Sequence, residues 1–140
     1  MNNSTTIICK NLDNPISSFH PHAKKVGNLI FISGIIPKQK DQKLIPGCIY
    51  DERNNVIGHD VKTQFHATIQ NLKSILIDSN SSFENVVDIT VFLTDIKRDF
   101  KLFNEAYGEV FQNILPARTT VEVSRLPSPV CIELKVIAHI

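Results

Sequence analysis

The chain has 140 residues, which is enough for one domain spanning residues 1–140 and too short for two. Hydrophobic residues make up 42% of it, and 15 Lys and Arg residues nearly balance 14 Asp and Glu residues, so the composition excludes a disordered chain and disfavours a nucleic-acid-binding protein. Apolar runs such as residues 29–32 are far shorter than the ~20 residues of a membrane-spanning helix. The three cysteines are widely spaced and no secretory signal begins the chain, which predicts a soluble cytoplasmic protein without a membrane partner.

The first half of the chain predicts strands followed by a long connection. Two weak strands are expected at residues 6–10 and 19–26, and a clearer apolar strand at residues 29–36 follows a Gly27–Asn28 turn. Residues 37–59 are mostly polar and contain proline and glycine, which predicts a loose hairpin or an ordered loop.

Two segments carry the 3.6-residue period of an amphipathic helix. The first covers residues 61–77, with Asp60 in the N-cap position. The second covers residues 100–114, with Asp99 as the expected N-cap. Gly108 lies inside this second helix, where we expect it to allow close packing on a sheet.

The remaining strands are expected at residues 86–93, 118–123 and 130–139, each with alternating apolar and polar positions. This order predicts an α+β fold in which one sheet carries both helices on one face. The other face is expected to be polar and either to meet water or to form a cleft with other copies of the chain. The residues expected on that polar face are Asp88, Thr90, Arg118, Thr120, Glu122, Glu133 and Lys135.

Arg118 and Glu133 are the first candidates for chemistry. Arginine grips a carboxylate through two parallel hydrogen bonds, and a glutamate in a cleft can act as a general acid or base. Together they suit a small carboxylated substrate that undergoes proton transfer or hydrolysis. From spacing alone, a surface ion pair worth about 0–1 kcal/mol is the more common explanation of these two residues.

Several longer motifs resemble the reactive intermediate/imine deaminase family (Rid, or YjgF). The resemblance extends from about residue 19 to residue 138. The motifs that carry it are Gly27-Asn28-Leu29-Ile30-Phe31-Ile32-Ser33-Gly34, the helix with Gln64, Ala67, Asn71 and Leu72, Val91-Phe92-Leu93-Thr94-Asp95, Phe100-x-x-Phe103-Asn104-x-x-Tyr107, Pro116-Ala117-Arg118 and Glu122-Val123-x-Arg125-Leu126-Pro127. Residues 19–25 (FHPHAKK) are similar to the 2-aminomuconate deaminase branch of that family.

This resemblance implies a chorismate-mutase-like fold and a homotrimer with three clefts between subunits. It also implies hydrolysis of small carboxylated enamines or imines to a carbonyl compound and ammonia, without a cofactor or a metal. The expected substrate is 2-aminomuconate, and the alternative is a general 2-imino acid such as 2-iminobutanoate or 2-iminopropanoate. The resemblance places Arg118 on the substrate carboxylate and Glu133 on the attacking water.

Six further residues are expected to bind substrate on the same basis. Ser33, Gly34 and Asn104 match residues that line or support the family's site, and Thr120 stands where many members have cysteine. His20 or His22 replaces a tyrosine of the general enzymes. For a dicarboxylate, we expect a second anion contact from His22, Lys24 or Arg125.

Two other classes of function stay open from the sequence: a carboxylate-binding module without catalysis, and an RNA-acting protein. The near-zero net charge argues against an RNA partner. The pair His20-x-His22 suggests zinc, but hydrogen-bonded or solvated histidines are the more common outcome. Lys38, Lys40 and Lys43 are expected to lie in a solvated loop.

Overall fold

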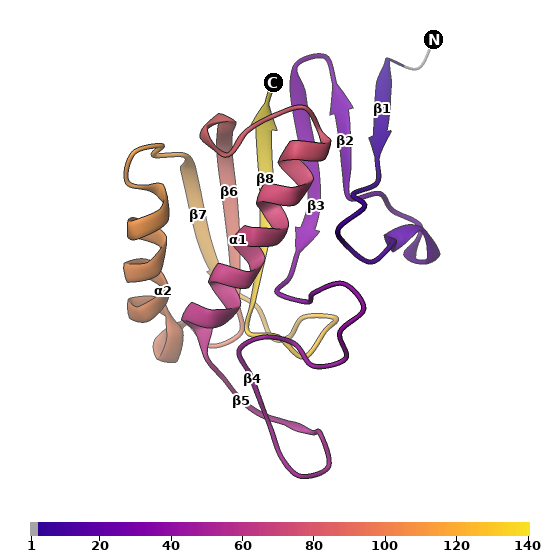
Figure 1. Ribbon diagram of the computed structural model, residues 1–140. Helices are drawn as coiled ribbons and strands as arrows, with labels where there is room; N and C mark the ends of the chain where they lie inside the picture. The colour runs from indigo at the N-terminus through magenta and orange to yellow at the C-terminus, as the bar shows by residue number, and fades with distance from the viewer. Residues whose placement is uncertain (1–2) are drawn as a thin grey trace.

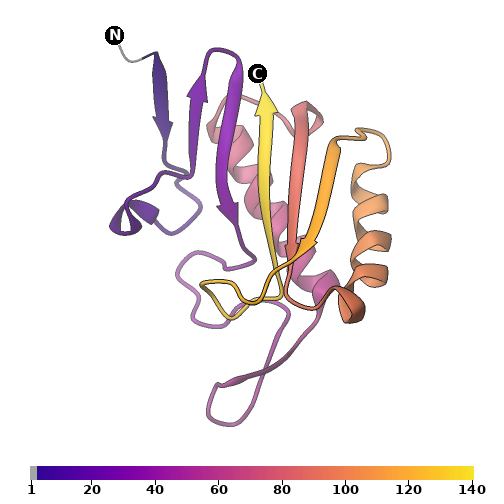
Figure 2. The same cartoon turned by 180° about the vertical axis from the view of Figure 1, so that it is seen from behind.

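The computed structural model describes residues 3–140, the side chain of Ile16 apart. Among these residues, a six-stranded mixed sheet has the order β1-β2-β3-β8-β6-β7, and only β6 and β7 are parallel neighbours. Both helices cover the same face of this sheet (Figure 1), and Figure 2 shows the opposite face uncovered. The α+β class with two helices on one face is therefore confirmed. The elements are β1 (Ser4–Ile7), the 3-10 turn η1 (Pro15–Ser18), β2 (Ala23–Val26), β3 (Leu29–Ile35), β4 (Cys48–Tyr50), β5 (Val56–His59), α1 (Val61–Asp78), the 3-10 turn η2 (Phe83–Asn85), β6 (Val86–Leu93), α2 (Ile96–Phe111), β7 (Ala117–Glu122) and β8 (Ile132–His139).

Helix α1 lies where the apolar period predicts it. The Asp60 side chain caps it by accepting a hydrogen bond from the backbone N–H of Thr63 at 3.0 Å. Its apolar stripe is buried against the sheet, with Phe65 and Leu72 fully covered. This stripe and the inward face of β8 are part of the hydrophobic core of the described residues.

Helix α2 begins four residues earlier than the sequence predicts. Asp95 is the N-cap and accepts from the Arg98 N–H at 3.0 Å, so the expected cap at Asp99 is wrong. Asp99 is buried instead, and its two carboxylate oxygens accept from Arg98 Nε and Nη2 at 2.9 and 2.7 Å. The expectation for Gly108 is also wrong, because this residue is exposed and an added β-carbon would have no neighbour within 4 Å.

The face on which β7 presents its side chains corrects a second expectation. The register places Arg118 beside Ile89 and Glu122 beside Leu93, and both β6 partners are buried under the helices. Arg118, Thr120 and Glu122 therefore lie on the helix-covered face. Alternation along a strand separates its two faces but does not say which one meets the helices.

The uncovered face carries the other polar residues, as expected. Glu133 pairs with Phe92 and Lys135 pairs with Thr90 on this face. It also carries partly exposed apolar side chains: Leu29, Phe31 and Val121 are 44%, 38% and 37% exposed. This mixture is typical of a surface that another protein chain covers.

The connection between β3 and α1 contains the hairpin expected in residues 37–59. Strands β4 and β5 pair with each other outside the main sheet, and the hairpin projects beyond the end of the sheet (Figure 1). Among the described residues, neither helix has the length and apolar character to cross a membrane.

Candidate functional site

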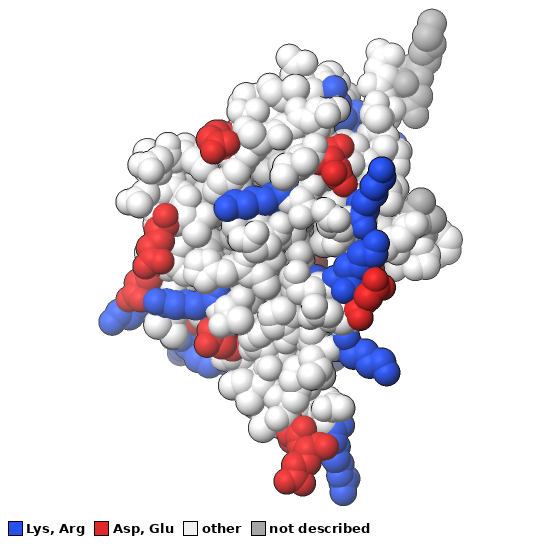
Figure 3. Space-filling model, viewed as in Figure 1, with Lys and Arg blue, Asp and Glu red and all other residues white. Residues whose placement is uncertain are grey.

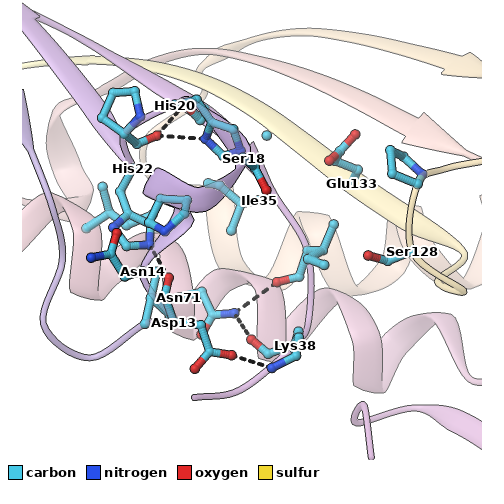
Figure 4. Close-up of a pocket in the computed structure, with 18 residues that line it drawn as sticks. Asp13, Asn14, Ser18, His20, His22, Ile35, Lys38, Asn71, Ser128 and Glu133 are labelled. Atoms are coloured by element: carbon cyan, nitrogen blue, oxygen red, sulfur yellow. Dashed lines mark hydrogen bonds and ion pairs between the residues drawn. The ribbon is translucent and has the colours of Figure 1, made fainter. Parts of the chain in front are cut away.

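A cavity of about 420 Å³ lies between the segment after β1, the end of β3 and the loop before β8. Five of the expected site residues line it: His20, His22, Ser33, Gly34 and Glu133. Figure 4 shows this cavity, with Glu133 and Ser128 on one side and Asp13 and Lys38 on another. Its volume is in the range of small-molecule binding sites.

Glu133 is the acidic group of this cavity that has the properties of a proton carrier. Its side chain is half-buried on β8, and this burial raises the pKa of its carboxyl group. No ion pair joins it to another side chain within residues 3–140. Gly34 leaves the space that the carboxyl group occupies, because a β-carbon at residue 34 would lie 2.7 Å from Glu133 Oε1. A carboxyl with a raised pKa suits general acid and base catalysis.

Ser33 lines the cavity beside Gly34. Its hydroxyl donates to the Pro21 carbonyl at 2.7 Å, and its backbone N–H donates to the His22 carbonyl at 2.9 Å. The register between β3 and β8 shifts between Ile32 and Ile35 at this point. Such a bulge changes the direction of the side chains beside it. The end of β3 is therefore separated from β8 where the cavity lies.

His22 is a structural residue of the cavity wall. The backbone N–H of Cys9 donates to its Nδ1 at 2.8 Å, so Nε2 must carry the proton and donate to the Asp13 carbonyl at 3.0 Å. Burial lowers the pKa of the imidazole, which agrees with this neutral form. Both ring nitrogens are thus occupied, so His22 holds the segment of residues 9–13 in place while it lines the cavity.

His20 keeps its expected place at the cavity. Its side chain is exposed, lines the cavity, and has Nδ1 3.1 Å from the Pro21 carbonyl. The two histidines of the His20-x-His22 pair therefore have different environments. Among the described residues, no group of three or more His, Cys, Asp or Glu side chains has the arrangement of a metal site.

The Arg118 side chain packs against helix α2 and does not line the cavity. Its Nη1 donates to Asn104 Oδ1 at 2.8 Å, and its guanidinium carbon lies 4.6 Å from the ring centre of Tyr107 and 5.8 Å from that of Phe103. Stacking on aromatic rings stabilises a guanidinium and fixes its plane. Thr120 lies two residues further along the same face of β7, and its buried hydroxyl has no hydrogen-bond partner within the described chain.

Tyr107 was not among the expected site residues, although the helical period gave the signal. Residues 100, 103, 104 and 107 recur every three or four positions and so share one face of α2. That face lies against the Arg118 guanidinium, which the sequence placed on the other side of the sheet. Lys38 was also missed as a cavity residue, because its neighbouring lysines suggested a solvated loop.

Arg118 and Glu133 do not meet in one chain. Strand β6 lies between their strands β7 and β8. Phe92 of β6 pairs with Glu133 on one side and with Val121 on the other, and Arg118 lies three residues before Val121. Standard sheet spacings place their Cα atoms roughly 14 Å apart, with the side chains on opposite faces. A small molecule therefore cannot contact both groups of the same protomer.

Comparisons with known proteins agree with the fold. Residues 11–140 match the family model described as Endoribonuclease L-PSP. Protein HMF1 of Saccharomyces cerevisiae is 40% identical over 134 residues, covering 96% of this chain and 93% of that protein. The crystal structure of the YjgF gene product of E. coli has a TM-score of 0.80 and 30% identity, covering 96% of this chain and 98% of that one. The structure of E. coli TdcF with bound serine has a TM-score of 0.80 and 28% identity, covering 97% and 98% of the two chains.

Proposed function

The chain belongs to the Rid, or YjgF, family, and on that premise we propose that it hydrolyses small carboxylated imines or enamines to a carbonyl compound and ammonia. The observation that carries the proposal is the half-buried Glu133 carboxyl, with its raised pKa, in a cavity of small-molecule size. TdcF binds serine, a small carboxylated amine, which supports the same class of ligand here.

The proposed chemistry uses two groups of the protein. Arg118 binds the substrate carboxylate beside the reacting carbon. Glu133 protonates an enamine at carbon to give the iminium ion, and the resulting carboxylate accepts a proton from the water that adds to the C=N carbon. The same carboxyl then gives this proton to the amine nitrogen. As the C–N bond breaks and ammonia leaves, the C=O bond forms and the hydroxyl proton returns to the Glu133 carboxylate. One carboxyl with a pKa close to the working pH can perform each of these proton transfers.

The separation of Arg118 and Glu133 makes a second copy of the chain part of the proposal. Each site would combine Glu133 of one protomer with Arg118 of its neighbour, in a homotrimer with sites between subunits. The partly exposed apolar side chains of the uncovered sheet face support such an assembly. In a closed trimer, every subunit then contributes Glu133 to one site and Arg118 to another.

Mixing two inactive variants tests this arrangement directly. Arg118→Ala and Glu133→Gln are each expected to abolish ammonia release. In trimers mixed randomly from equal amounts, an interface is intact when one subunit supplies Glu133 and its neighbour supplies Arg118. This happens at about one interface in four, so roughly a quarter of wild-type activity should return. No recovery in trimers that contain both variants would refute the shared site.

The narrower proposal for the substrate is 2-aminomuconate, and it rests on the likeness of residues 19–25 to one branch of the family. The alternative is a general 2-imino acid. Ammonia release would be compared between 2-aminomuconate generated in place and 2-iminobutanoate generated by an amino-acid oxidase. Faster release from 2-iminobutanoate would favour the general deaminase.

The description of the family model also favours a second candidate, an RNA-acting protein. On the helix-covered face, however, Lys and Arg side chains are interspersed with Asp and Glu (Figure 3). Proteins that bind RNA through its phosphates show clustered basic residues and steep salt dependence. RNA binding that weakens steeply with salt would support this second candidate.

A further inference from the structure

Lys38 lies in the same cavity as Glu133 but has no part in the proposed chemistry. It is the one Lys or Arg side chain among the described residues that line this cavity. Figure 4 places its ammonium group beside Asp13 and apart from the Glu133 carboxylate. The cavity therefore offers an acid–base group at one place and a cation at another.

The position of Lys38 is fixed by helix α1. The buried amide of Asn71 donates from Nδ2 to the carbonyls of Ile36 and Lys38, both at 2.9 Å. The third polar contact of this amide comes from Gln39 Nε2, which donates to Asn71 Oδ1 at 3.2 Å. An amide that makes three hydrogen bonds in this position holds the turn after β3 against the cavity.

The ammonium group of Lys38 is also held in place. It forms an ion pair with Asp13, whose other carboxylate oxygen accepts from the Asp41 N–H at 3.1 Å. It also donates to the Gln39 carbonyl at 3.5 Å. An ammonium carries three N–H donors, and these two contacts use two of them, so it can serve a further acceptor.

We infer that Lys38 binds an acidic group at the far end of the substrate, so that the site selects dicarboxylates over monocarboxylates. The inference rests on the proposed function, which places the reacting carbon at Glu133. Gly34, which touches Glu133, is four residues from Lys38, so their Cα atoms are at most about 14 Å apart. A six-carbon dicarboxylate extends further from the reacting carbon toward Lys38 than a three-carbon imino acid does.

This inference replaces the expected second anion contacts. Both ring nitrogens of His22 are occupied, and neither Lys24 nor Arg125 lines the cavity formed by its own chain, whereas Lys38 does. Because Asp13 already neutralises the Lys38 ammonium, the gain from a second carboxylate is limited to about one charge-assisted hydrogen bond. We expect a preference of about tenfold, which equals about 1.4 kcal/mol.

The test compares two stable keto acids, 2-oxobutanoate and 2-oxoadipate, whose binding is measured by calorimetry. Wild-type protein should bind 2-oxoadipate about tenfold more tightly. Lys38→Met should lose this preference without weakening 2-oxobutanoate, and Lys38→Arg should keep most of it. The matched control is Lys43→Met, which removes the same charge from an exposed residue outside the cavity and should behave as wild type.

Three results would overturn the inference: no preference in the wild type, the same preference in Lys38→Met, or equal loss of both ligands in Lys38→Met with both kept in Lys38→Arg. Turnover of 2-iminobutanoate by the wild type tests the proposed function separately. Turnover with an unchanged ligand preference in Lys38→Met overturns the role of Lys38 alone. A preference lost in Lys38→Met without any turnover overturns the deaminase and keeps the dicarboxylate site.

Discussion

Replacing Gly34 by alanine places a methyl group against the Glu133 carboxyl group. The added β-carbon would lie 2.7 Å from Oε1 and 2.9 Å from Cδ of Glu133. Ordinary contacts between such atoms are about 3.5–4.0 Å, so the carboxyl group must move by about 1 Å. A misplacement of about 1 Å can lower a rate about 100-fold. We therefore expect Gly34→Ala to reduce kcat/KM for imine hydrolysis by about two orders of magnitude.

The same substitution should leave the fold intact. The backbone of Gly34 has a negative φ, which alanine adopts without strain, and the displaced atoms are the end of one side chain. A glycine-to-alanine change at such a position stabilises by about 0.4–1 kcal/mol through the unfolded chain. This gain and the cost of moving Glu133 should roughly cancel, so the midpoint of thermal unfolding should stay within a few degrees of wild type.

Gly108→Ala is the matched control, because its added β-carbon has no neighbour within 4 Å. In a helix this change should stabilise by about 1 kcal/mol, and activity should stay at the wild-type level. The assay is ammonia release from 2-iminobutanoate, measured beside thermal unfolding for each protein. Full activity in Gly34→Ala would refute the role given to the Glu133 carboxylate. Lost activity together with a large drop in the unfolding midpoint would refute the local clash.

Further predictions concern three side chains. Burial raises the pKa of Glu133, so the folded protein keeps a proton that the unfolded chain releases, and stability is lost as the pH rises through the raised pKa. Glu133→Gln should therefore raise the unfolding midpoint at pH 8 but not at pH 4; an equal gain at both would contradict this. Arg118→Lys loses the planar fork that Asn104 holds, so KM should rise at least about tenfold; unchanged KM would argue against carboxylate binding there. Tyr107→Phe removes a buried hydroxyl that has no hydrogen-bond partner among the described residues and should keep stability and carboxylate affinity, whereas Tyr107→Leu should weaken binding in calorimetry.

The sequence predicts an element well where the burial pattern and the capping residue agree. Helix α1 has both, since its stripe meets the sheet and Asp60 caps it. Helix α2 has a second aspartate inside its first turn, and Asp99 looks like a cap. Its burial beside Arg98 comes from tertiary packing, which a local pattern does not contain.

The identity of the candidate site residues could be predicted from the sequence, but their arrangement in space could not. Arg118 and Glu133 both follow from their types and from family motifs. Their placement on opposite faces depends on the parallel pairing of β7 with β6, a long-range feature with no local signature. The hydrogen bonds of His22 could not be predicted for a related reason, because its two partners, Cys9 and Asp13, come from a segment whose path the sequence does not reveal.

The far wall of the cavity is built from two short segments, residues 13–18 and 36–39, whose described side chains lie outside the core cluster. Polar contacts hold them in place: the Asp13–Lys38 ion pair joins one segment to the other, and the Asn71 amide of α1 donates to two carbonyls of the second. Sequence changes there alter the shape and charge of the cavity without disturbing the packing that stabilises the domain. A mutant library confined to these two segments is thus the economical way to engineer new substrate ranges on this scaffold.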